Sequence, residues 1–440
     1  MSYKKKTWLL IAVATMLRCI IAVSIDLGND EVYYRMYAQQ LQWNYFDHPP
    51  MTGWLIRLTT LNLFFDSEFF IRLGAVISAA ITTWLFFCCG KKLNNAYSGF
   101  LAAGIYTATI YGSIISGTFI LPDSPQMIFW AGGLYLLINI TSYTNINRTK
   151  KTDMLLFGIA MGLGMLCKIH TSFLWLGFFL YALFHNRQWF KEPVLYIAGL
   201  ITLVLFYPVI QWNINNHFVT YLYHSKRVDV SSGGFQLSSF LSFAGGQVFY
   251  SNPIIFLLLV TALIQSIKNR LPVLLSQKRI LLYSSLPLIV LATGLSFFRE
   301  VLPHWTGPAY SGLILLAACY LSKQKEQTIF KRRFMPPVLT AAISLLFIII
   351  IGGVLLINYL PGTLGKQDKQ IFGEDDFTLD MYGWKSLKTE MRAIIKTDLR
   401  SGIMKQDAVI ICNKWFPASH IDHYVAIPLK KNLQIGRAHV

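Results

Sequence analysis

A succession of apolar segments joined by short polar connections is the feature of this sequence that most restricts its fold. An α-helix crosses the hydrocarbon core of a bilayer in about 17 to 25 apolar residues. Eleven segments, two of them short, approach that pattern at residues 7–25, 69–89, 97–120, 124–142, 153–167, 169–185, 194–212, 253–268, 279–298, 305–322 and 336–359. Because 54% of the residues are hydrophobic and only 14% are charged, a soluble globule is excluded and a polytopic helical membrane protein is predicted.

Both ends of the chain carry signals that concern processing rather than packing. The first apolar segment follows a run of three lysines, but no small-residue cleavage site precedes Asp26. We therefore expect a retained signal-anchor helix rather than a cleaved signal peptide. Residues 435–440 resemble the translation of a sequencing adapter, so we interpret them as an artefact and expect the natural protein to continue beyond Gln434.

The positive charges fall in short clusters in every second connection between the apolar segments. Cytoplasmic connections of membrane proteins carry such an excess of Lys and Arg, so we place these connections and the N-terminus in the cytoplasm. The net charge of +18 is not gathered on one continuous face, and nucleic acid is therefore excluded as a partner. The six cysteines show no CxxC or Cys/His ligand spacing, so neither a disulfide framework nor a zinc site is expected.

The opposite set of connections, which this topology places outside the cytoplasm, holds most of the candidate chemical groups. They are Asp30 with Glu31, Asp47 with His48, Asp123, Lys168 with His170, the loop 213–250, and Arg299 with His304. After an odd number of spans the C-terminal segment also lies outside, and its mixed polar sequence predicts a small α/β fold. We divide the chain into a transmembrane domain at residues 1–360 and an incomplete extracytoplasmic domain at residues 361–434.

The first outer loop, residues 26–68, has the composition of membrane-surface helices. Residues 30–41 place several tyrosines on a helix, and a second helix can begin after the paired prolines Pro49 and Pro50. Aromatic-rich amphipathic helices lie in the interface between lipid headgroups and hydrocarbon. We expect extracytoplasmic interfacial helices here, where a lipid-borne substrate would meet an aqueous one.

Asp30 is the leading candidate for a catalytic group. A carboxylate at the membrane boundary is costly unless it is solvated, paired or used in chemistry. An Asp beside an incoming hydroxyl can act as a general base, and cationic groups can stabilise a departing phosphate. Lys168, His170, Arg299 and His304 are the outer-face candidates for that second role. No phosphate-binding glycine loop precedes a helix, so no nucleotide cofactor is expected.

Taken together, the motifs resemble those of the bacterial glycosyltransferase family 39, which groups protein O-mannosyltransferases with the lipid A aminoarabinose transferase. The resemblance covers nearly the whole chain, and it rests on the order of several short motifs. These are Asp30-Glu31, Tyr45-Phe-Asp-His-Pro-Pro50, Leu121-Pro-Asp-Ser-Pro125, Leu166-Cys-Lys168, Leu302-Pro-His-Trp305 with Pro308-Ala-Tyr310, and Tyr382-Gly-Trp384.

The resemblance implies a C-type glycosyltransferase fold in the bacterial inner membrane, with about eleven transmembrane helices, outer-face interfacial helices and a C-terminal extracytoplasmic domain. It implies transfer of a sugar from a polyprenyl-phosphate donor to an acceptor hydroxyl or phosphate outside the cytoplasm, with inversion at the anomeric carbon. The acceptor is then a lipid, a glycan or a protein, and membrane lipids surround the enzyme. The family's catalytic Asp corresponds to Asp30, and Glu31 is its acidic neighbour.

The corner at Asp47 and His48 departs from part of the family. The family's acidic residue there, which in some members helps to hold a divalent metal, corresponds to Asp47. We therefore retain a divalent metal at Asp47 as an expectation. His48 stands where the lipid A transferase has a lysine that faces the lipid phosphate. Phosphate binding is therefore assigned instead to Lys168 and Arg299, with His304, while Asp47, His48 and Asp123 form the substrate or metal neighbourhood.

Each candidate also has a structural interpretation that the sequence leaves open. Asp30 and Asp123 occur where a helix cap is needed, and Asp47 with His48 precedes a proline turn. Lys168 could extend to lipid headgroups. The alternative function is a transporter or flippase of lipid-linked saccharides, which would be expected to show repeats and ionisable residues at the bilayer midplane. The sequence instead gathers its charges at the outer face.

Overall fold

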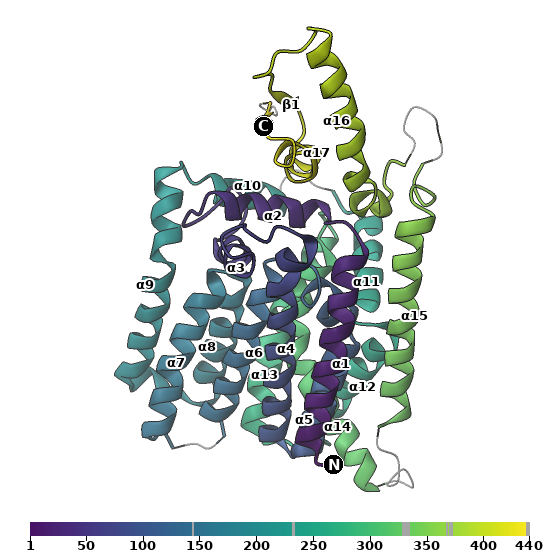
Figure 1. Cartoon of the computed structure of the whole chain (residues 1–440). Coiled ribbons are helices and arrows are strands. Elements are labelled where there is room, and N and C mark those ends of the chain that lie inside the picture. The colour runs from purple at the N-terminus through teal and green to yellow at the C-terminus, as the bar shows by residue number, and fades with distance from the viewer. Residues whose placement is uncertain (143–144, 231–233, 328–334, 367, 369–372, 437–440) are drawn as a thin grey trace. The chain divides into compact units, whose positions relative to one another are not determined.

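The computed structural model describes residues 1–142, 145–230, 234–327, 335–366, 368 and 373–436. The described part is mainly helical (Figure 1). Its α-helices are α1 (Tyr3–Ser24), α2 (Asn29–Gln39), α3 (Met51–Thr59), α4 (Glu68–Leu93), α5 (Ala96–Ala108), α6 (Asp123–Ile140), α7 (Arg148–Met165), α8 (Phe173–His185), α9 (Pro193–Asn215), α10 (Val219–Val228), α11 (Leu237–Tyr250), α12 (Pro253–Ile267), α13 (Leu275–Ser296), α14 (Tyr310–Gln327), α15 (Pro337–Tyr359), α16 (Trp384–Arg400) and α17 (Trp415–Ile421).

Short turns of other helix types and one small sheet complete the described elements. The 3₁₀ turns are η2 (Ile169–Ser172), η3 (Arg187–Lys191), η4 (Pro303–Ala309) and η6 (Phe377–Met381), and the π turns are η1 (Tyr111–Ile115) and η7 (Asp422–Ala426). The strands β1 (Ile410–Cys412) and β2 (Leu433–Ile435) pair in parallel, with Ile410 opposite Leu433. Residues 437–440, most of the tail interpreted as an artefact, lie outside the described residues.

Each of the eleven predicted apolar segments contains a helix, but the predicted number of membrane spans is not confirmed. Five described helices, α1, α4, α9, α13 and α15, are long and apolar enough to cross a membrane. Helices α11 and α12 are together long and apolar enough for a sixth span, but the pair is bent by 95° and would form a broken span. The number eleven stays a prediction, since several of the apolar windows form helices shorter than a bilayer-spanning length. A multi-pass membrane protein is nevertheless supported.

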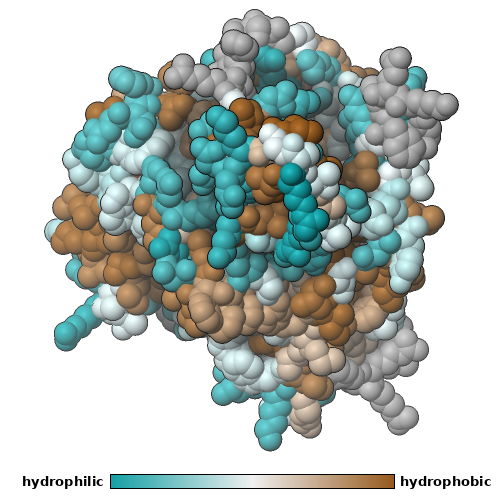
Figure 2. Space-filling view, turned by 45° about the horizontal axis from the view of Figure 1, so that its top comes forward, coloured by the Kyte–Doolittle hydropathy of each residue, from teal (hydrophilic) through white to brown (hydrophobic). Residues whose placement is uncertain are grey.

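Exposed apolar side chains follow one side of the long helices. On α9, Leu200, Leu203 and Val204 are 59–62% exposed, at the spacing of one helical face. The space-filling view shows brown hydrophobic residues beside teal hydrophilic ones on the surface of the molecule (Figure 2). A helix face this apolar is stable when lipid rather than water surrounds it.

The chain divides into two compact units. The first unit contains residues 1–18, 42–52 and 74–347, and the second contains residues 19–41, 53–73 and 348–440. The loop that carries Asp30 and the C-terminal segment therefore belong to the same unit, although the sequence suggested a division near residue 360. That predicted domain boundary stays a prediction.

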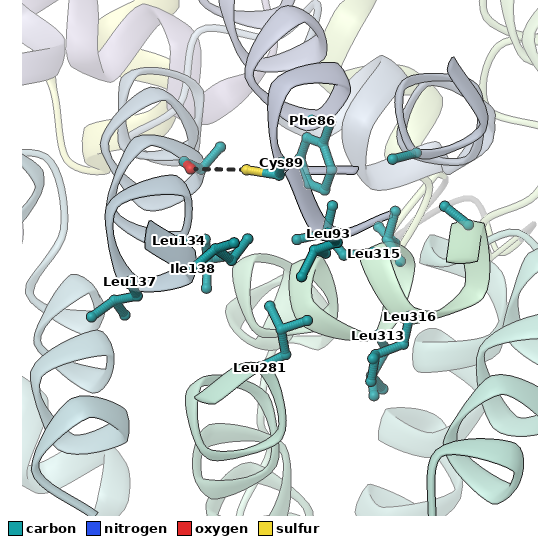
Figure 3. Packing of buried hydrophobic residues seen from close by; sticks show 14 of the residues in the cluster. Phe86, Cys89, Leu93, Leu134, Leu137, Ile138, Leu281, Leu313, Leu315 and Leu316 are labelled. Atoms are coloured by element: carbon teal, nitrogen blue, oxygen red, sulfur yellow. Dashed lines mark hydrogen bonds between the residues drawn. The ribbon is translucent and has the colours of Figure 1, made fainter. Parts of the chain in front are cut away.

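The core of the first unit lies between α4, α5, α6, α13 and α14. Phe86, Cys89 and Leu93 of α4 pack with leucines of α6, α13 and α14, and the Cys89 thiol donates a hydrogen bond to the carbonyl of Ala131 (Figure 3). Helices α4 and α5 approach so closely that a Cβ at Gly99 would lie 2.5 Å from the carbonyl oxygen of Phe87. Only glycine fits there. Arg18 of α1 is 2% exposed and donates to the carbonyl of Gly112.

The second unit joins α2 to the C-terminal helices. The rings of Tyr33 on α2 and Trp415 on α17 lie 4.4 Å apart between centroids. Helix α2 begins where predicted, because the Glu31 carboxylate accepts the backbone N–H of Gly28 at 2.9 Å and so satisfies a donor at the helix start. The C-terminal segment contains helices and two short strands among its described residues. Location of α2 and α3 at the membrane surface stays a prediction.

Candidate functional site

Asp30 and Glu31 are neighbours on α2 but have opposite surroundings. Asp30 is exposed, whereas Glu31 is 2% exposed. Adjacent residues on a helix point about 100° apart, so one carboxylate can face outward while the other is buried. Glu31 forms a two-pronged ion pair with Arg72, with Nε–Oε1 at 2.8 Å and Nη2–Oε2 at 2.5 Å. Glu31 is thus held in a structural contact, and Asp30 is the carboxylate that a reactant can approach.

Arg72 is a residue that the sequence interpretation missed. Its guanidinium, fully buried on α4, also donates to the carbonyls of Ala22, Ile25 and Asp26 at 2.8–3.0 Å. All five N–H groups of the side chain therefore bond to the segment from the last turn of α1 to the first turn of α2. A signal was present, because an arginine inside a predicted apolar span is costly unless it has partners.

Asp123 and Lys168 form a buried ion pair in the first unit. Asp123 is the first residue of α6, and its Oδ2 lies 2.8 Å from Nζ of Lys168, at the turn between α7 and η2. The hydroxyl of Tyr111 donates to the other carboxylate oxygen at 2.9 Å. Burial raises the pKa of Asp123, but Lys168, His304 and these hydrogen bonds outweigh it and hold that pKa at about 2. The carboxylate is therefore ionised at neutral pH.

Two histidines, His48 and His304, interact electrostatically with both members of this ion pair. Burial is the main reason that the pKa of each is lowered to about 4, and the charge of Lys168 lowers both further. Both imidazoles are therefore neutral at pH 7 and can donate or accept hydrogen bonds. The structure thus brings four predicted site residues together, namely Asp123, Lys168, His48 and His304.

The backbone of Asp47 contacts His224, which lies next to His48. Its carbonyl oxygen lies 2.7 Å from Nε2 of His224, whose ring centroid is 6.0 Å from that of His48. Among the described residues, no three His, Cys, Asp or Glu side chains are arranged to hold a metal ion. The divalent metal expected at Asp47 stays a prediction, and no chemical step below uses it.

Arg227, which the sequence interpretation did not single out, is the arginine that acts on His304. Its charge contributes to the lowered pKa of His304, and its guanidinium lies 5.2 Å from the ring centroid of Trp305. Arg299, the predicted phosphate ligand, instead donates from Nε to the carbonyl of Asp229. A signal for Arg227 existed in the basic pair that ends α10, inside the long outer loop.

A cleft of about 490 Å³ opens in the second unit beside Asn29, the residue before Asp30. Carboxylates and aromatic rings line it, at Asp375, Asp376, Asp380, Phe377, Trp384 and Phe416. Asp376 is already engaged, since its oxygens accept from the backbone of Leu364, Gly365 and Thr378. Burial raises the pKa of Asp380, although a hydrogen bond with Asn29 lowers it in part.

In sequence, the chain is similar to glycosyltransferases. The model of the family described as dolichyl-phosphate-mannose-protein mannosyltransferase matches residues 47–212. The lipid A galacturonosyltransferase RgtD of Rhizobium johnstonii is 24% identical over 320 residues, which are 72% of this chain and 66% of that protein. The chain thus spans slightly less than two thirds of this relative's length.

Solved structures show the same fold. ArnT from Cupriavidus metallidurans in the apo state matches 99% of this chain and 87% of its own, with a TM-score of 0.63 and 14% identity. The oligosaccharyltransferase AglB of Archaeoglobus fulgidus, solved with an inhibitory peptide and a dolichol-phosphate, matches 98% of this chain and 65% of its own, with a TM-score of 0.51 and 11% identity. The predicted resemblance to glycosyltransferase family 39 is thereby confirmed: the chain is similar in sequence to glycosyltransferases of lipid-linked sugars and has the fold of ArnT.

Proposed function

We propose that this protein transfers a sugar from a polyprenyl-phosphate donor to an acceptor on the outer side of the bacterial inner membrane, with inversion, and that Asp30 is the general base. The observation that carries this proposal is the contrast on the first turn of α2. Arg72 holds Glu31 in place, while the adjacent Asp30 is exposed on a helix that the same arginine anchors.

In the proposed reaction, the Asp30 carboxylate takes the proton from an acceptor hydroxyl as the oxygen bonds to the anomeric carbon. The bond between that carbon and the donor phosphate oxygen breaks, and the polyprenyl phosphate leaves with the electron pair. Because the attack comes from the face opposite the phosphate, the configuration at the anomeric carbon inverts. An acceptor phosphate, already ionised, would react without transferring a proton to Asp30.

The departing phosphate is assigned to the first unit. Lys168 supplies a buried positive charge that is balanced by Asp123, and Asp123 retains the Tyr111 hydroxyl as a second partner. Lys168 can therefore turn toward a phosphate without leaving a carboxylate with no hydrogen bond. His304 and Arg299 complete the proposed phosphate ligands, and a charge-assisted contact there would stabilise the leaving group.

The acceptor is assigned to the cleft beside Asn29. Its aromatic rings offer faces on which a sugar ring can pack, and its carboxylates can accept hydrogen bonds from hydroxyls. A lipid-linked saccharide is the first acceptor to test, because the relative RgtD is named for its action on lipid A. A surface glycan or a protein hydroxyl fits the same chemistry.

Sugar release from a panel of polyprenyl-phosphate sugars, by purified protein in lipid, tests the proposal. We expect turnover by the wild type on at least one donor and a loss of more than about 100-fold in Asp30→Asn, the scale of general-base catalysis. Asp407→Asn, an exposed Asp outside the site, is the matched control and should keep full activity. Equal turnover in Asp30→Asn and wild type would refute the base assignment. No turnover with any donor, together with lipid-saccharide movement across vesicles, would favour the flippase alternative.

A further inference from the structure

The residues immediately before Asp30 are held by a part of the chain almost four hundred residues away. The backbone N–H of Leu27 donates to the hydroxyl of Tyr424 at 2.8 Å, across 397 positions of sequence. The side chain of Asn29 bonds through Oδ1 to Nε2 of His420 at 2.9 Å. Between them, Gly28 faces Met381, whose Cγ would lie 3.6 Å from an added Cβ.

These contacts are buried and geometrically specified. Leu27 and His420 have no exposed surface, and Tyr424 is 6% exposed. The Tyr424 hydroxyl donates its hydrogen to Oε1 of Glu68 at 3.1 Å, so it can only accept from Leu27. The His420 ring stacks on Trp384 at 4.0 Å and 7°, which fixes the direction in which Nε2 points.

The bond from His420 also has a defined donor. The Asn29 oxygen only accepts, so the imidazole must donate from Nε2. Burial, with a smaller contribution from His423, lowers the pKa of His420 to about 3, so the ring is neutral at pH 7. The proton therefore resides on Nε2, and the contact is an ordinary hydrogen bond between neutral groups.

The series of contacts along the loop ends just before Asp30. Arg72 holds the carbonyls of residues 22, 25 and 26, Tyr424 holds residue 27, and His420 holds residue 29. Asp30 follows with an exposed side chain. A displacement of the loop would move the carboxylate directly, and the rate of a positioned proton transfer is sensitive to shifts of about 1 Å.

We propose that Tyr424 and His420 are positioning residues for Asp30, so that the C-terminal segment completes the catalytic centre rather than merely covering it. The inference rests on the proposed role of Asp30. Removing either contact should lower the rate of the chemical step and leave donor binding unchanged, because neither side chain lies among the proposed phosphate ligands.

Steady-state kinetics and amide hydrogen exchange of the full chain in lipid test this together. Tyr424→Phe removes one hydroxyl, and we expect kcat to fall about tenfold, the effect of one lost hydrogen bond, with KM for the donor unchanged. Exchange of the Leu27 amide should become about tenfold faster. His420→Leu should also lose kcat, whereas His420→Gln, which keeps an N–H donor, should recover most of it.

The controls separate this inference from the function on which it rests. Tyr359→Phe removes an exposed hydroxyl from the same unit and should change neither kcat nor the exchange. If Tyr424→Phe kept the kcat and the Leu27 exchange rate of the wild type while Asp30→Asn was inactive, that result would overturn the positioning role and leave the proposed function standing. Equal loss of kcat in His420→Gln and His420→Leu would also overturn it for His420. Full turnover in Asp30→Asn would instead refute the proposed function itself.

Discussion

Two buried ion pairs of similar chemistry differ in how their partners are engaged. In the second unit, Glu31 binds Arg72 with both oxygens, and the remaining N–H groups of the arginine are taken up by three backbone carbonyls. In the first unit, Lys168 binds one oxygen of Asp123, and the other oxygen keeps a tyrosine hydroxyl. In the Glu31–Arg72 pair every N–H group of the arginine has a partner. In the Asp123–Lys168 pair, the lysine can exchange its partner.

We propose that the difference separates a structural ion pair from one that takes part in the reaction. Arginine offers five donors in a rigid fork and stays charged, which suits a fixed clamp, whereas the single ammonium of lysine can be redirected. Neutral His48 and His304 lie within electrostatic reach of the Asp123–Lys168 pair. We therefore expect the two pairs to respond differently to mutation and to acid.

Breaking the Glu31–Arg72 ion pair should have the largest effect on stability. Arg72→Met removes the partner of Glu31 and leaves a buried carboxylate without its counter-charge, which costs about 3–5 kcal/mol. We expect a large fall in the thermal unfolding temperature in detergent, and activity should disappear with the fold. Arg72→Met combined with Glu31→Gln should recover part of the lost stability. If Arg72→Met alone were as stable as the wild type, the Glu31–Arg72 pair would not be a structural contact that the fold needs.

Breaking the exchangeable pair should act mainly on catalysis. Lys168→Gln keeps a polar group near Asp123 but removes the charge proposed to meet the donor phosphate. We expect kcat/KM to fall about 100-fold, equivalent to about 2.7 kcal/mol, with a smaller loss of stability than in Arg72→Met. Steady-state kinetics with the active donor and thermal unfolding measure the two effects. A larger loss of stability than of activity would reverse the contrast drawn here.

Acid should weaken the first unit before it breaks the Asp123–Lys168 pair. His48 and His304 have pKa values of about 4 in the folded protein, below the value of about 6.5 for the unfolded chain. The unfolded chain therefore binds more protons as the pH falls through 6.5, and the folded state loses stability until about pH 4. The pKa of Asp123, about 2, keeps its carboxylate ionised throughout that window.

We expect a loss on the order of 2 kcal/mol for each histidine at pH 5 relative to pH 7.5, seen as a lower unfolding temperature. His48→Gln should lose less stability than the wild type over the same change of pH. Stability of the wild type that rises between pH 7.5 and 5 would contradict the direction of these pKa shifts.

Local features of the fold follow from short-range sequence signals. The apolar segments coincide with helices, and α2 begins within one residue of the predicted position because Gly28 and Glu31 form a helix start. Asp123 and Lys168 were each predicted as site residues from their surroundings. Helix periodicity and caps depend on residues three or four apart, which is why they can be read directly from the chain.

The partners of those residues were not predictable in the same way. Glu31 meets Arg72 across 41 positions, Lys168 meets Asp123 across 45, and Leu27 meets Tyr424 across 397. Nothing local distinguishes a lysine that contacts lipid from one that closes a buried ion pair. The predicted number of spans is likewise not confirmed, since apolar windows do not report how long each helix becomes.

The sequence by itself therefore determined that the chain is a helical membrane protein, because apolar length controls membrane insertion. Its charge clusters predict that the candidate groups lie in outer loops. Only the tertiary structure decided which of two adjacent carboxylates is buried and which is exposed. It also joined the C-terminal segment to the loop before Asp30. Those outcomes depend on which distant side chains desolvate and pair with one another, and no pattern within a single segment contains that information.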